Sequence, residues 1–230
     1  MLLFAIAKAL VRGIVIGTCS NYKETIIWRL CPCLKWTKNL KCILCESFSF
    51  THICDYCQET FLTPSIYKRK LLNNIEVISF YKYKDIKNLL HTKHTDIGYY
   101  IYSILAKNSL KLFAQNFEYS NLVSSIAIDD NIKSGYSHTA ILNKSLKSRY
   151  IKPEFNSLRA KNSISYSGKS REFRLMNPRD FSFTQSSSKN IILVDDIITT
   201  GSTLIQAINT LQKSDKTPLF CLTLSDANNQ

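Results

Sequence analysis

The sequence predicts an α/β protein with a parallel sheet flanked by helices, preceded by a small cysteine-rich unit. Short apolar runs rich in β-branched residues, typical of strands buried on both faces, occur at 122–128 and 191–194. Each run is followed by a polar turn and then by apolar residues at helical spacing, which is the alternation of an α/β fold. Between positions 42 and 57 lie two C-x-x-C pairs, a pattern typical of metal binding.

The main chemical pattern lies at 190–203, which reads N-I-I-L-V-D-D-I-I-T-T-G-S-T. After the apolar run come two carboxylates, Asp195 and Asp196, and then a turn of small residues that leads into a helix. Backbone N–H groups and hydroxyls at a helix N-terminus suit a phosphate, and the carboxylates suit sugar hydroxyls or Mg²⁺. The pattern predicts a phosphorylated sugar as ligand, with an ordinary buried strand ending in an acidic turn as the alternative. A Walker A loop is excluded, because its G-K-[ST] element is missing.

This window resembles the 5-phosphoribosyl-1-pyrophosphate (PRPP) motif of the type I phosphoribosyltransferases. The resemblance implies a type I phosphoribosyltransferase-like domain that binds PRPP together with Mg²⁺. Asp195 and Asp196 would hold the ribose and act as the catalytic residues. The remaining PRPP-binding residues implied by the motif are Ile197, Thr199, Thr200, Gly201, Ser202 and Thr203.

Composition supports a globular protein with an anionic partner. The chain has 230 residues, 45% of them hydrophobic, and 30 Lys+Arg against 17 Asp+Glu give a formal net charge of +13. A charge of this size favours nucleic acid first and an anionic membrane surface second. Codon bias toward Lys, Asn and Ile is the alternative explanation. The eight cysteines are interpreted as reduced thiols of a cytoplasmic protein rather than as a disulfide framework.

Residues 1–38 form an N-terminal extension whose status stays open. Residues 1–18 are apolar but interrupted by Lys8 and Arg12, which fits neither a signal peptide nor a stable transmembrane span. A weak amphipathic surface helix, a hydrophobic tether, and sequence upstream of the true start are the three interpretations, the last slightly favoured.

Residues 39–62 are predicted to form a zinc knuckle. Its four ligands would be Cys42, Cys45, Cys54 and Cys57, because two thiolates from each C-x-x-C pair can complete a tetrahedral Zn²⁺ site. Redox thiols and chance are the alternatives. Cys31, Cys33 and His52 are interpreted as bystanders.

The phosphoribosyltransferase-like domain is predicted at 75–226, after a linker at 61–74 with the basic run 68–70. Residues 76–83 alternate as a strand, and apolar residues at helical spacing follow through position 105. Lysines there interleave with tyrosines, which suits either a nucleic-acid single strand or a solvated helix face. A final strand is predicted at 217–224.

Two further segments are expected at the ligand site. The strand at 122–128 ends in Asp129 and Asp130, and the turn at 132–138 is the expected pyrophosphate-side loop, because ligands gather at the carboxyl ends of parallel strands. The polar stretch 155–183 is interpreted as a basic lid or a disordered insert. Its candidates for closing over the ligand or contacting DNA are Arg159, Lys161, Lys169, Arg171 and Arg174.

The order of knuckle, basic lid and PRPP motif resembles the ComF family of competence proteins. Arg159-Ala-Lys161-Asn-Ser163 and Arg174-Leu-Met-Asn177 fit that family's lid pattern, whereas the P-V-P-L and R-G-[FY]-N elements on the pyrophosphate side are replaced here. The resemblance implies a cytoplasmic, PRPP-binding protein that acts on single-stranded DNA in natural transformation. Its partners would be other DNA-uptake or recombination proteins, and association with the inner membrane is left open. A catalytically active phosphoribosyltransferase of nucleotide metabolism and a PRPP sensor are the alternatives, and turnover is left open.

Overall fold

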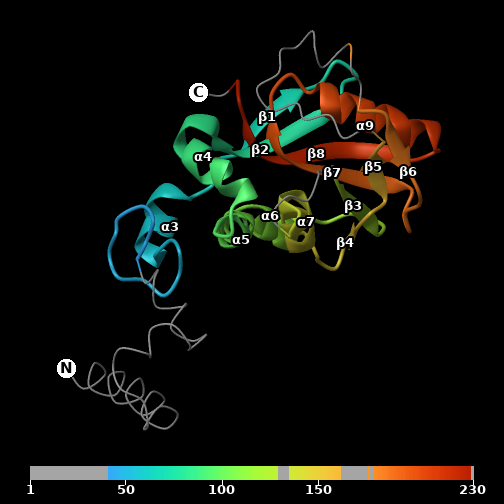
Figure 1. Ribbon diagram of the computed structural model, residues 1–230. Helices are drawn as coiled ribbons and strands as arrows, with labels where there is room; N and C mark the ends of the chain where they lie inside the picture. Colours follow the sequence, from blue (N-terminus) through green and yellow to red (C-terminus); the bar gives the residue numbers. More distant parts are fainter. Residues whose placement is uncertain (1–40, 129–134, 162–175, 177–178, 229–230) are drawn as a thin grey trace, which may run out of the picture.

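The computed structural model describes residues 41–128, 135–161, 176 and 179–228, and Figure 1 shows how they are arranged. The central sheet has six strands in the order β1-β2-β8-β7-β3-β4. Only β1 runs antiparallel to its neighbour, so the sheet is mostly parallel, as predicted. The strands of this sheet are β1 Tyr67–Lys70, β2 Glu76–Lys82, β3 Val123–Ala127, β4 Ile151–Glu154, β7 Asn190–Ile198 and β8 Thr217–Asp226.

Helices cover both faces of this sheet, and a two-stranded ribbon lies beside one of them (Figure 1). The ribbon pairs β5 Leu158–Ala160 with β6 Phe181–Phe183. The helices are α3 Asp55–Phe61, α4 Tyr83–Leu90, η2 His91–His94 (3₁₀), α5 Gly98–Asn108, α6 Leu110–Asn116, α7 His138–Ser145 and α9 Ser202–Lys213.

The apolar run of β7 is continuous because each face of this strand belongs to a different core. Ile192 and Val194 pack with α4, α5, α6 and α7, whereas Ile191 and Leu193 pack with α9 and the β5–β6 ribbon. All four side chains are fully buried. A strand with two buried faces needs apolar residues at every position, so alternation is lost.

The carboxyl ends of β3 and β7 form the switch point of the sheet. From β3 the chain crosses through α7 to β4 on one side, and from β7 it crosses through α9 to β8 on the other. The two crossovers move apart at this point, and α/β proteins bind ligands at such a switch point. The acidic pair lies in the last part of β7, and the glycine turn follows the strand directly.

The predicted strands at 76–83, 122–128, 191–194 and 217–224 correspond to β2, β3, β7 and β8. The linker predicted at 61–74 is wrong in part, because it contains β1, which pairs with β2. The helical pattern that ends at position 105 is divided into α4, η2 and α5. Among the described residues, no helix is both long and apolar enough to cross a membrane. The N-terminal extension and Asp129–Asp130 lie outside the described residues.

Candidate functional site

The turn between β7 and α9 has the geometry of an anion site. Thr200 is exposed and Ser202 and Thr203 are half-buried, so their hydroxyls are accessible at the start of α9. The Thr200 hydroxyl donates to Ser202 Oγ at 3.1 Å. The first intrahelical bond is donated by Ile205 N to Gly201 O at 2.9 Å. The N–H groups of the residues before Ile205 therefore have no partner within α9 and can bind an anion.

Gly201 is the residue that gives this turn its shape. Its φ is +81°, in the left-handed region, and it is the N-cap of α9. A Cβ built there would lie 2.6 Å from Leu71 Cδ2, which is closer than side chains can pack. The backbone conformation therefore requires glycine, and an added Cβ would also force the end of the Leu71 side chain to shift.

Asp196 is buried and held by three side chains from other elements. Its Oδ2 accepts from Lys93 Nζ at 3.2 Å and from Tyr102 OH at 3.2 Å, and it pairs with His138 Nε2 at 3.3 Å. Burial opposes ionisation of this carboxyl, but the hydrogen bond from His138 and the charges of His138 and Lys93 outweigh it and lower its pKa. The same burial and the charge of Asp196 raise the pKa of Tyr102, which therefore stays a hydrogen-bond donor.

Asp195 occupies a different environment from its neighbour. It is half-buried, and its Oδ1 accepts the N–H of Asp196 at 2.8 Å. Burial and the adjacent negative charge of Asp196 raise the pKa of Asp195 well above its ordinary value, although Arg179 and Lys93 act in the other direction. The pair therefore contains one carboxylate committed to internal partners and one carboxyl that holds its proton more strongly, which is the pattern of paired acids at functional sites.

Arg69 of β1 supports the glycine turn from behind. Its guanidinium donates to the carbonyl of Thr199 at 2.8 Å and pairs with Asp226 at 3.2 Å. Ala227 N donates to Ile198 O at 2.8 Å, which ties the end of β8 to the same turn. The turn is therefore fixed by the edge strand β1 and by β8, outside its own segment.

Sequence patterns do not identify these supporting residues as part of the site. They place Lys93 in a basic helical segment, Arg69 in a linker and His138 at the end of a loop, and they single out no role for Tyr102. In sequence, Asp196 lies 103 residues from Lys93 and 94 from Tyr102. The rule that α/β proteins bind ligands at the carboxyl ends of their strands predicts where the site lies, but it does not predict which side chains from other elements reach it.

The predicted lid is only partly described. Arg159 lies in β5, and Lys161 pairs with Asp180 at 3.2 Å, both side chains being exposed. Arg179 N donates to Gln206 Oε1 of α9 at 2.9 Å, so the end of this segment rests on α9. Lys169, Arg171 and Arg174 lie outside the described residues.

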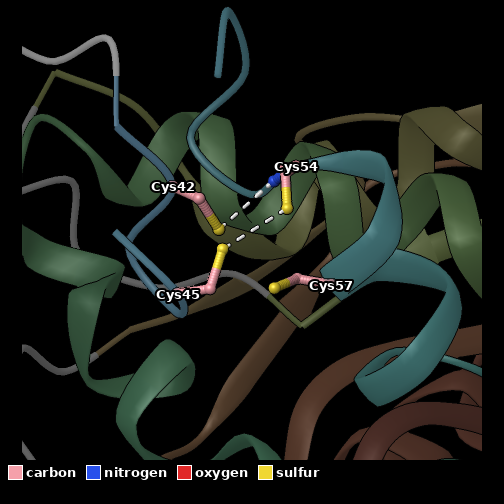
Figure 2. A group of neighbouring side chains, drawn as sticks. All are labelled: Cys42, Cys45, Cys54 and Cys57. Carbon is pink, nitrogen blue, oxygen red and sulfur yellow. Dashed lines mark hydrogen bonds between the residues drawn. The ribbon is translucent and has the colours of Figure 1, made fainter. Parts of the chain in front are cut away.

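The four predicted metal-ligating cysteines converge, as Figure 2 shows. The Sγ atoms of Cys42, Cys45, Cys54 and Cys57 all lie within 4.8 Å of one another, and those of Cys45 and Cys54 are 3.7 Å apart. Four thiolates around Zn²⁺ at about 2.3 Å place neighbouring sulfurs about 3.8 Å apart, so the cluster could bind zinc. Cys54 N donates to Cys42 Sγ at 3.3 Å. Although burial opposes it, this N–H and those of Cys45 and Leu44 lower the pKa of Cys42 to about 6, whereas burial and the neighbouring thiols raise the pKa of Cys57.

The cysteine unit is packed into the main core rather than held apart from it. Ile53 and Leu62 are buried in the same cluster as Ile101, Tyr102 and Leu105 of α5. His52, interpreted as a bystander, stacks on Tyr100 with ring centroids 4.4 Å apart, and Gln58 accepts from Asn108 at 3.2 Å. The cysteine cluster therefore lies in a segment that covers the helix carrying Tyr102.

Comparison with known proteins identifies the relatives of this chain. A family profile described as PRTase-CE matches residues 60–226. A hypoxanthine phosphoribosyltransferase from Staphylococcus aureus is 16% identical and superposes with a TM-score of 0.34, covering 56% of this chain and 65% of that one, just under two thirds of its length. Mycobacterium tuberculosis H37Rv orotate phosphoribosyltransferase in complex with Fe(III) dicitrate is 12% identical with a TM-score of 0.34, covering 76% of this chain and 96% of that one. No curated protein matches the sequence.

Proposed function

The chain belongs to the PRTase-CE family, and from this premise we propose that its phosphoribosyltransferase-type domain binds PRPP with Mg²⁺ at the carboxyl end of β7. The observation that carries the proposal is the glycine turn: a helix N-terminus with accessible hydroxyls, shaped by Gly201 and placed at the switch point of the sheet. An anion is the ligand that such a turn accepts.

The roles follow from the environments of the residues. The segment from Thr199 to Thr203 would hold the 5′-phosphate with its N–H groups and hydroxyls. Asp195, which is not fully buried, would accept the ribose hydroxyls. Asp196 would act as an anchor that fixes Lys93 beside the site, since its Oδ2 already has three partners. Bound Mg²⁺ would neutralise charge on the diphosphate, and carboxylate and phosphate oxygens are the ligands it prefers.

Transfer of the ribose to an acceptor is the stronger form of this proposal. Type I phosphoribosyl transfer requires charge stabilisation and positioning rather than covalent catalysis. Lys93 is a suitable cation, since its side chain is 25% exposed while it pairs with Asp196. Release of pyrophosphate from PRPP upon addition of candidate acceptor bases distinguishes a transferase from a protein that only binds PRPP.

The binding proposal is tested by thermal denaturation with and without PRPP and MgCl₂. A ligand at 100 times its Kd stabilises the native state by about 2.7 kcal/mol, a shift that is readily measured. Asp195→Asn should remove most of the shift, whereas Asp215→Asn, at an exposed carboxylate paired with Lys189, should keep it. No shift in the wild-type protein, or the same shift in both variants, would contradict the proposal.

A role in uptake of single-stranded DNA is the second candidate. It is supported by the resemblance to ComF proteins, the cysteine cluster that could bind zinc and the formal net charge of +13. It implies a cytoplasmic protein whose partners act in DNA uptake or recombination. The test is the affinity for a fluorescent single-stranded oligonucleotide at several salt concentrations, because neutralised phosphates give a steep salt dependence. Weak binding that does not change with salt would exclude this candidate.

A further inference from the structure

A groove between α5 and α7 is not used by the PRPP proposal. Its volume is about 600 Å³, within the range of small-molecule sites. None of its described lining residues carries a carboxylate. Its described lining residues that matter for recognition are Tyr99, Tyr136, Lys107, Lys111, Lys144 and Lys147.

One end of the groove is aromatic. The rings of Tyr99 and Tyr136 lie 5.9 Å apart at the N-terminal ends of α5 and α7, and Tyr99 is 46% exposed. Tyr136 is fixed, since its hydroxyl shares its one proton between the carbonyls of Lys93 at 2.9 Å and Thr95 at 3.1 Å. An exposed ring beside a rigidly held one offers a surface on which a planar base can stack.

The other end is cationic. Lys107 is in the last turn of α5, Lys144 is in the last turn of α7, and Lys111 and Lys147 follow close behind. All four side chains are exposed, and none of them pairs with a carboxylate in the described part of the chain. Eight residues separate Tyr99 from Lys107, so the aromatic and cationic ends are about 12 Å apart at 1.5 Å per helical residue.

We propose that this groove binds a nucleoside polyphosphate, with its base against Tyr99 and its phosphates among the four lysines. The ligand class follows from the polarity of the groove, because rings gather at one end and cations at the other. A single strand that tracked the groove would instead be matched by rings and cations alternating along its length. The proposal uses none of the residues from Asp195 to Thr203, but it shares Tyr136 with the turn at 132–138 that is expected on the pyrophosphate side.

Isothermal titration of the full-length protein with ATP, AMP and tripolyphosphate, and with a twelve-residue thymidine oligonucleotide, tests this proposal. ATP should bind at least tenfold more tightly than AMP, which lacks the distal phosphates, and more tightly than tripolyphosphate, which lacks the base. Lys107→Glu/Lys144→Glu should weaken ATP binding at least tenfold. Tyr99→Ala should weaken ATP binding but leave tripolyphosphate binding unchanged.

The matched control is Lys152→Glu/Lys213→Glu, which makes the same charge change at two exposed lysines outside the groove and should keep ATP affinity. Ser202→Glu, which places a carboxylate in the glycine turn, should also keep it, so that binding at the PRPP site is told apart from binding in the groove. Absence of ATP binding would overturn the proposal, as would equal losses in the two double-lysine variants, loss in Ser202→Glu, or tight binding of the oligonucleotide alone.

Discussion

The role of Asp196 as a buried anchor leads to a quantitative prediction about stability. Asp196→Asn removes the charge that pairs with Lys93 and His138 and leaves the partners in place. The side chains of Asp196 and His138 are 9% and 4% exposed, so solvent cannot replace the lost interaction. Breaking a buried pair in this way costs about 3–5 kcal/mol. For a domain of this size the melting temperature should fall by roughly 10 °C.

Urea unfolding followed by fluorescence measures this loss. The midpoint should fall while the m-value stays constant, which separates a change in stability from a change in the unfolded state. Tyr102→Phe removes one hydrogen bond to the same oxygen and should cost only about 1–2 kcal/mol. Asp215→Asn, at an exposed pair, should cause little change.

The pH dependence provides an independent check. Because the pKa of Asp196 is lowered in the folded protein, its contribution is present above the unfolded value of about 3.9 and disappears as the pH falls through the folded pKa. The titration of Asp196 should therefore not change the difference in unfolding free energy between wild type and Asp196→Asn from pH 5 to 7. That difference should shrink only at more acidic pH. A variant as stable as wild type at pH 7 would refute the anchor role and return Asp196 to the set of direct ligand-binding residues.

Three further predictions concern other parts of the molecule. Asp195→Asn should stabilise the free protein, and more at pH 8 than at pH 5 in urea unfolding, because a carboxyl whose pKa is raised loses its stabilising contribution as the pH rises through that pKa. Gly201→Ala should cost about 2–4 kcal/mol, from its φ of +81° and the contact with Leu71, and a double-mutant cycle with Leu71→Ala should show coupling. Cys42→Ser should lower the bound zinc measured by mass spectrometry from about one per chain, whereas Cys221→Ser, outside the cluster, should keep it.

Much of the parallel sheet could be predicted because buried strands carry their own signal. The runs of β3, β7 and β8 carry their signal within the strand itself, and the spacing of the two C-x-x-C pairs indicates that they can share one site. β1 gave no such signal: Tyr-Lys-Arg-Lys has no apolar alternation, and it forms a strand only because it pairs with the edge of β2. Lysines on an edge strand also discourage pairing with other chains.

The candidate site was predictable only where it is local in sequence. The acidic pair ends one strand and the glycine turn follows it directly, so a short motif can describe both. The environment of Asp196 depends on how η2, α5 and α7 pack against β7, which brings Lys93, Tyr102 and His138 to one oxygen. No pattern within a short window records that packing, and the opposite pKa shifts of Asp195 and Asp196 could therefore not be anticipated.

Since Ile53 and Leu62 are buried beside Tyr102, binding of the proposed zinc would be coupled to the folding of the domain. Without metal, the segment that carries them would lose its cross-link, and one side of α5 would be uncovered. Tyr102 would then be less firmly positioned toward Asp196. Zinc supply would in this way affect how the domain folds. A chain made under metal starvation would have an incompletely assembled acidic pair, even though no cysteine lies near that pair in sequence.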